Sequence, residues 1–289
     1  MIASGFRSRI VHDASCPDIS PVHCSESDIP DHIHDQRITF VNIQSQAYYA
    51  FGNGLQVAFF LPVQLRGSQI DYFLKDSGAD YVPPYAGIHH RNEVLYGLGD
   101  AELGLQYFEN IGNWMVGGGL NSSLPFGQIE ENPYELGAES KAHQHFQMGT
   151  GTFVPSLELI LGWSHARHGV LSRYRLDVPL YENEYAYQTG RAQRWQVGYW
   201  HRVGPKVTLL GQALGHHEQA DTWLGYTAPF SGRHALGLGG AAMVRVKGRQ
   251  ELMLRLERNI LERSLSAELN DEEGAVPPFL LLSVGYSWL

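Results

Sequence analysis

Lysine is scarce in this sequence, and long apolar runs are absent. Only four of the 289 residues are lysine, and the formal net charge is −9. Because nucleic-acid binding needs clustered Lys and Arg to neutralise phosphates, we expect no nucleic-acid partner. No stretch approaches the ~20 consecutive apolar residues of a membrane-spanning helix. A membrane β-barrel stays possible, since its alternating strands average to the hydropathy of a soluble protein.

Cysteine is nearly absent as well. Cys16 and Cys24 are the only two. Their separation suits one small disulfide loop in an oxidising compartment, and two unpaired thiols are the alternative. Residues 1–5 lack the apolar core, roughly 7–15 residues long, of a secretory signal peptide. If the protein is exported, we expect its leader to have been removed or to lie upstream of Met1.

Apolar and polar residues alternate along most of the chain. In residues 55–66 every odd position is apolar, whereas the even positions include Gln56, Gln64 and Arg66. A period of two indicates β-strands with one apolar and one polar face. The pattern predicts twelve strands, over about residues 3–12, 36–51, 55–70, 96–110, 114–126, 150–166, 170–177, 191–203, 206–217, 233–246, 249–259 and 277–288.

Short turns and long polar loops connect these strands alternately. The long loops span roughly residues 13–35, 71–95, 127–149, 178–190, 218–232 and 260–276. An even number of strands with this alternation is typical of outer-membrane barrels, whose short turns are periplasmic and whose long loops are extracellular. A soluble β-sandwich is the alternative, but it gives no reason for the alternation. We predict an all-β fold for residues 1–289, a single antiparallel transmembrane β-barrel domain with periplasmic termini, inserted by the barrel-assembly machinery.

In such a barrel the apolar face of each strand meets lipid and the polar face lines the lumen. The predicted pore-lining residues are Arg7, Arg9, Gln44, Gln46, Glu102, Gln106, Glu158, Arg194, Arg202, Arg245, Glu251, Arg255 and Glu257. Twelve strands enclose a wider interior than the side-chain-filled barrels of eight strands. Both an open conduit and a lumen plugged by paired charges or by loops are compatible with this pattern.

Three glycine-rich pieces resemble one family of outer-membrane barrels. Residues 97–105 (GLGDAELGL) resemble its GLGD-x-x-LG strand, residues 117–127 (GGGLNSSLPFG) its GLSLPTG strand end, and residues 147–153 (QMGTGTF) its QxGTGT strand start. The family comprises the transporters named after the meta-pathway of phenol degradation (MetA-like), which are compared with FadL-type channels for hydrophobic compounds. The resemblance covers residues 96–165. It implies a barrel and a transport role, but no active-site residues.

Histidine is unusually frequent, with 14 residues, most of them in or beside the long loops. His143 and His145 form an H-x-H that puts both rings on one face of an extended segment, as a shared metal would require. The candidate ligands for zinc or copper are His143, His145, His89, His90, His216 and His217. Solvated, pH-responsive loop histidines are the alternative reading.

A hydrolase is the third possibility. Outer-membrane phospholipase A is also a twelve-stranded barrel with an H-x-S pair, but here the serine position of that pair is His145. We therefore expect no enzyme and no cofactor, apart from the possible transition metal. The sequence predicts an outer-membrane channel or transporter for passive uptake or efflux of a small compound, hydrophobic compounds included. Outer-membrane lipid and the transported molecule are its expected partners.

Overall fold

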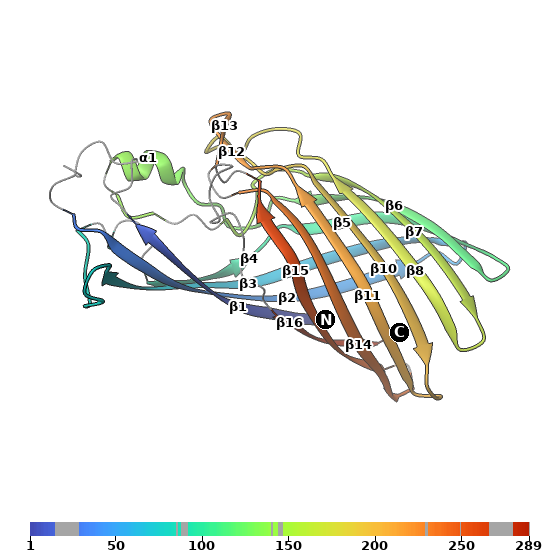
Figure 1. The fold of residues 1–289 in the computed structure, drawn as a ribbon. Coiled ribbons are helices and arrows are strands. Elements are labelled where there is room, and N and C mark those ends of the chain that lie inside the picture. The colour runs from blue at the N-terminus through green and yellow to red at the C-terminus, as the bar shows by residue number, and fades with distance from the viewer. Residues whose placement is uncertain are drawn as a thin grey trace.

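The computed structural model describes residues 1–14, 29–84, 86–87, 92–139, 141–143, 147–228, 231–248, 250–265 and 280–288. The main sheet has 13 strands, each antiparallel to its neighbours. Of these, β4 (Glu93–Leu98) pairs with β3 alone among the described strands, and the other twelve form a closed barrel because β1 pairs with both β2 and β16. The predicted twelve-stranded barrel is confirmed (Figure 1).

The barrel strands follow chain order around the wall. They are β1 (Ile2–Ala14), β2 (His32–Ala50), β3 (Leu55–Leu74), β5 (Ala101–Ile111), β6 (Trp114–Leu124), β7 (Pro155–His165), β8 (His168–Asp177), β10 (Ala192–Arg202), β11 (Val207–Glu218), β14 (Arg233–Lys247), β15 (Gln250–Ser264) and β16 (Leu280–Trp288). Tight hairpin turns connect successive strands at one end of the barrel. Gly54 at one of these turns has a φ of 85°, which a side chain disfavours.

The long connections lie at the opposite end, as Figure 1 shows. They carry one short helix, α1 (Pro133–Ala138), and a small sheet of β9 (Tyr187–Gln188), β12 (Thr222–Trp223) and β13 (Tyr226–Thr227). The alternation of strands does not predict these pieces, because they are built within loops. Among the described residues, no helix is long and apolar enough to cross a membrane.

The predicted strand over residues 96–110 is broken in the structure. β4 ends at Leu98 and β5 begins at Ala101, so that β3 pairs first with β5 and then, further along, with β4. A Cβ atom on Gly99 would lie 2.2 Å from the side-chain nitrogen of Gln64, so a larger residue at the step would displace the Gln64 side chain. One edge of β4 pairs with β3, and its opposite edge has no strand partner among the described residues.

The outer surface of the barrel is apolar and parts of its interior are polar. Leu103 and Leu105 on β5 are 47% and 50% exposed, whereas Glu158 on β7 is fully buried. This arrangement is the reverse of a water-soluble domain, and it suits lipid, where a closed sheet satisfies all backbone hydrogen bonds. The fold therefore places the chain in the outer membrane.

An arginine introduced into the middle of the apolar surface should destabilise the barrel. Leu159 lies at the centre of β7 on the outer face and is 52% exposed. We expect Leu159→Arg to lower the free energy of unfolding in phospholipid vesicles by about 2–4 kcal/mol. Phe153→Arg, at the loop-side rim, should cost only about 0–1 kcal/mol. Denaturant titration with tryptophan fluorescence measures both, and equal costs would contradict the placement of the apolar surface.

Candidate functional site

The interior of the barrel is the candidate site, and the strand register places most predicted pore-lining residues on its inner face. Those on the inner face are Gln44, Gln46, Glu102, Gln106, Glu158, Arg194, Arg202, Arg245, Glu251, Arg255 and Glu257. They come from six strands and approach one another across the lumen.

Arg7 and Arg9 do not line the lumen. The register pairs Arg7 with Thr39 and Arg9 with Arg37, all on the outer face. The inner face of β1 instead carries Ile2, Ser4 and Phe6, which line the interior cavities. The sequence prediction was wrong here because it assumed that the polar face of every strand points inward, whereas along β1 the larger polar side chains point outward.

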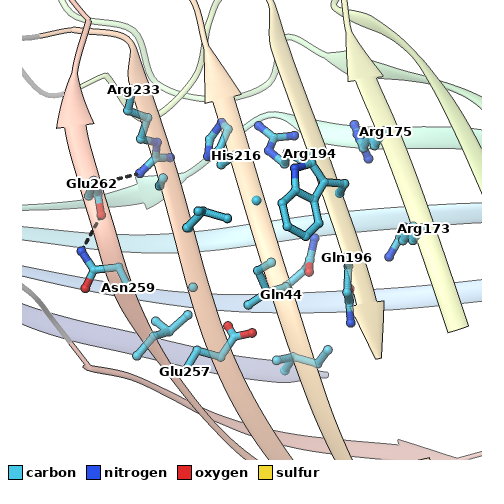
Figure 2. Close-up of a pocket in the computed structure, with 18 of the residues that line it drawn as sticks. Gln44, Arg173, Arg175, Arg194, Gln196, His216, Arg233, Glu257, Asn259 and Glu262 are labelled. Atoms are coloured by element: carbon cyan, nitrogen blue, oxygen red, sulfur yellow. Dashed lines mark hydrogen bonds and ion pairs between the residues drawn. The ribbon is translucent and has the colours of Figure 1, made fainter. Parts of the chain in front are cut away.

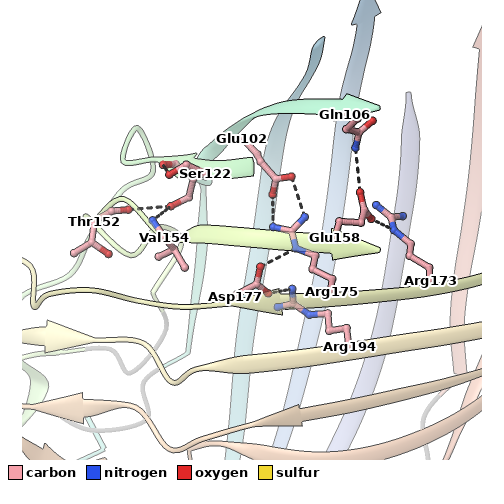
Figure 3. A network of polar contacts seen from close by, with 11 residues as sticks. Glu102, Gln106, Ser122, Thr152, Val154, Glu158, Arg173, Arg175, Asp177 and Arg194 are labelled. Atoms are coloured by element: carbon pink, nitrogen blue, oxygen red, sulfur yellow. Dashed lines mark hydrogen bonds and ion pairs between the residues drawn. The ribbon is translucent and has the colours of Figure 1, made fainter. Parts of the chain in front are cut away.

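A first network of charges spans the loop-side half of the interior (Figure 3). The Arg175 guanidinium donates to both oxygens of Glu102, at 2.9 and 2.6 Å, and to Asp177 at 2.7 Å. Arg194 donates to the other oxygen of Asp177. Since Glu102 lies on β5 and Arg175 on β8, this network joins strands that are not neighbours in the wall.

A second network is centred on the fully buried Glu158. It accepts hydrogen bonds from Arg173 and, at 3.0 Å, from the Gln106 amide, which in turn accepts from Gln56 at 2.7 Å. On the opposite wall Glu257 accepts from Gln212 and Arg255. Charge is therefore largely neutralised within the interior, where an unpaired ion would be costly.

Three charged participants in these networks were missing from the predicted pore-lining set, as were Gln56 and Gln212. Arg173, Arg175 and Asp177 occupy alternate positions of β8 and all face inward. Their spacing (R-x-R-x-D) was visible in the sequence and was the signal that could have identified them. Arg233 and Glu262, which both line the cavities, lie close to loops that the sequence analysis treated as extracellular.

Two adjoining cavities occupy the loop-side half of the interior. The first, of about 700 Å³, is bordered by Arg173, Arg175, Arg194, Glu257 and Glu262, with Phe60 and Leu214 among its apolar neighbours (Figure 2). The second, of about 670 Å³, is bordered by Phe6, Ile38 and Phe40, beside Gln64 and Arg66. Both volumes suit a small organic molecule.

The end of the interior near the short turns has an apolar lining. Seven inward-facing side chains, each from a different strand, form what we call the inner apolar ring: Phe108, Met115, Leu171, Trp200, Leu210, Met243 and Met253. Trp200 lies over Gly169, where a Cβ atom would be 2.7 Å from its ring, and Phe108 lies in the same way over Gly117. The interior is therefore not polar throughout, contrary to the simple alternation rule.

The three motifs that resemble the transporter family meet at one residue, Asp100. Its carboxylate accepts hydrogen bonds from the Gly127 N–H at 3.0 Å and from the Thr150 N–H and hydroxyl at 2.6 and 2.7 Å. Asp100 belongs to the first motif, Gly127 to the second and Thr150 to the third. This cluster sits directly at the step between β4 and β5 and ties both neighbouring loops to it.

The small sheet of β9, β12 and β13 is packed over an apolar core of Tyr187, Trp223 and Ala228. Asp221 fixes it by accepting hydrogen bonds from the Gly190 N–H at 2.8 Å and the Tyr187 hydroxyl at 3.0 Å. Burial raises the pKa of the Asp221 carboxyl above its ordinary value, although these hydrogen bonds act in the opposite direction. Because Asp221 also borders the second cavity, this small sheet lies beside the loop-side entrance.

The structure describes three of the predicted metal ligands, His143, His216 and His217, and it does not group them together. His216 faces inward, 3.3 Å from Glu218, whereas the ring of its neighbour His217 lies against His234 on the outer face. His143 is buried, with its Nδ1 atom 2.9 Å from the Lys141 carbonyl oxygen. His89, His90, His145, Cys16 and Cys24 lie outside the described residues. Within the described part of the chain, no three His, Cys, Asp or Glu side chains are grouped as metal ligands would be.

Solved structures of similar shape are outer-membrane barrels. The COG4313 outer membrane channel from Pseudomonas putida F1 has a TM-score of 0.54 and 13% identity, with 99% of this chain and 94% of that chain covered. The CymD monoaromatic hydrocarbon channel (TM-score 0.44, 9% identity, 99% and 87% covered) and the P. putida toluene transporter TodX (0.43, 13%, 99% and 77%) are less similar.

No family model matches the sequence, and no curated protein sequence matches it. At 13% identity the likeness to the COG4313 channel establishes the fold. It confirms the barrel that the three motifs implied.

The charge pair at the centre of the first network should be strongly coupled. In a double-mutant cycle of Glu102→Gln and Arg175→Gln, we expect a coupling free energy of about 1–3 kcal/mol, because both side chains are only 18–20% exposed. Arg245–Glu251, 3.4 Å apart and 55% and 26% exposed, is the control pair and should give less than about 1 kcal/mol. Denaturant titration in vesicles measures both cycles, and similar values would contradict the network's structural role.

Proposed function

We propose that this protein is an outer-membrane channel for the passive passage of small hydrophobic compounds. The observation that carries the proposal is the combination of interior cavities with the inner apolar ring. A channel for ions or sugars needs polar walls along its length, whereas apolar constrictions exclude them by dewetting. The names of the similar structures, a monoaromatic hydrocarbon channel and a toluene transporter, agree with this substrate class.

The second cavity offers both apolar contact and orientation to such a compound. Phe6, Ile38 and Phe40 supply the apolar wall. The Arg66 guanidinium lies 5.5 Å from the centre of the Phe40 ring and donates two hydrogen bonds to Gln64. A small aromatic molecule fits a site of this kind, because the aromatic and aliphatic side chains supply most of the contact area.

The step between β4 and β5 gives a route from this cavity to the lipid. Gln64 borders the cavity and is paired with Gly97 on β4, whose second edge has no strand partner in the described part of the chain. Beyond Gly97 the wall consists of loop residues Gln128 and Met148 rather than of another strand. We infer that a hydrophobic compound leaves sideways here, so that it need not cross the charged networks.

Transport in proteoliposomes tests the proposed function. We expect vesicles with the protein to take up a small aromatic hydrocarbon faster than empty vesicles, while their swelling in a sugar solution and their single-channel ion conductance stay close to background. The inner apolar ring is the physical reason for the low conductance. Sugar flux and ion conductance without faster hydrocarbon uptake would contradict the proposal.

A bulky side chain at Gly97 should obstruct the lateral route. A Cβ atom there already lies 3.2 Å from both Gln128 and Met148, so we expect Gly97→Trp to reduce hydrocarbon uptake by at least several-fold. Gly204→Trp is the control, because nothing lies within 4 Å of a Cβ atom at that turn. Heat-modifiability on gels shows whether each variant is folded. Unchanged uptake by folded Gly97→Trp would refute lateral exit.

A further inference from the structure

Arginines gather on the outer face of the barrel, towards its loop-side end, where they interrupt the apolar surface. They lie on both sides of the seam that β16 forms between β15 and β1, whose arrangement is visible in Figure 1. We call this group the outer arginine patch, and its members are Arg7, Arg9, Arg37, Arg258 and Arg263. The interior networks use none of them.

The strand register places two members of the patch, Arg7 and Arg258, at the same level of the barrel. Arg258 on β15 is paired with Leu280 on β16, an outward side chain that is 57% exposed. On the other side of β16, Leu282 is paired with Gly5 of β1. Arg7 follows Gly5 by two residues, just as Leu280 precedes Leu282 by two. Arg7 and Arg258 therefore flank Leu280.

Towards the loop-side end of β15 the exposed surface changes from apolar to mixed, because Arg258 and Arg263 are interspersed with Ile260, Leu261 and Leu265, which are 57%, 40% and 44% exposed. On the turn side of Arg258 and Arg7 the outward residues are leucines and valines, such as Leu256 and Leu282, which are 45% and 46% exposed. An arginine at the centre of a bilayer costs about 2–4 kcal/mol, but only about 0–1 kcal/mol at the interface. This position is thus the level of the lipid headgroups, whose phosphates are the anions found there.

Carboxylates neutralise only part of the patch. Arg9 donates to both oxygens of Asp35 at 2.7 Å, and Arg37 lies 3.0 Å from Asp71. Arg7, Arg258 and Arg263 form no ion pair with any described residue. Three exposed guanidinium groups on two strands, one on each side of β16, therefore have no carboxylate partner among the described residues, in a chain whose net charge is −9.

We propose that the outer arginine patch binds a lipid of the outer leaflet through its phosphate groups, and that the occupant is a bisphosphorylated glycolipid of the lipid A type. Guanidinium groups bind phosphate through two parallel hydrogen bonds, which lysine cannot form. The free arginines lie on both sides of β16, so a headgroup with two phosphates satisfies them better than a single phosphate does. The proposal uses the outer-membrane placement but not the transport activity.

Native mass spectrometry of the full chain in non-ionic detergent tests this binding. Bisphosphorylated lipid A is the probe, and its monophosphorylated form is the matched ligand. We expect the triple variant R7Q/R258Q/R263Q to bind bisphosphorylated lipid A at least tenfold more weakly than the unaltered protein. The unaltered protein should also prefer the bisphosphorylated form.

The control variant R167Q/K206Q/K247Q removes the same charge from exposed positions at the opposite, turn-side end, and it should bind within twofold of the unaltered protein. R7K/R258K/R263K keeps the charge but loses the two-pronged geometry, and it should bind with intermediate strength. Equal weakening by the patch and control variants, or no preference for the second phosphate, would overturn the proposal. Hydrocarbon uptake by the same variants separates this result from a failure of the proposed transport function.

Discussion

Closure of the sheet is the constraint on which this structure depends. In lipid every backbone N–H and C=O needs a partner within the protein, and a barrel meets this need only if its first and last strands pair. Among the described residues that contact is short, since β1 pairs with β16 over residues 2–5. The closed wall tolerates local departures from regular strand pairing. The step at Gly99 is placed where loop residues can cover the freed edge of β4.

The interior of the barrel combines a charged half with an apolar half. Arginines and carboxylates on the loop-side half satisfy one another across the lumen, as in Arg175 with Glu102 and Asp177. The turn-side half carries large apolar side chains that lie over glycines of neighbouring strands, such as Trp200 over Gly169. These close contacts account for part of the high glycine content, since a side chain at such positions would push its neighbour into the lumen.

The period-two alternation was sufficient to predict the barrel, the number of strands and the inward direction of Glu158 or Glu257, because each follows from local sequence. The alternation did not predict the direction of a side chain where that direction depends on how the strand pairs with its neighbours in the barrel. Arg7 and Arg9 are polar yet face outward, because the outer surface at the headgroup level accommodates charge. The step at Gly99 and the hydrogen bonds of Asp100 involve residues about 27 and 50 positions apart, which no local pattern reveals.

The strands differ greatly in length, and this gives the barrel a slanted rim. β2 and β3 have 19 and 20 residues, whereas β7 has 11. At about 3.3 Å per residue, the surplus of eight or nine residues adds roughly 28 Å along the strands, close to the thickness of a hydrocarbon core. Figure 1 shows β1, β2 and β3 reaching far beyond the shorter strands. The wall around the loop-side opening is therefore high along β2 and β3 and low along β7. A molecule from the medium can reach the interior more directly over the shorter strands.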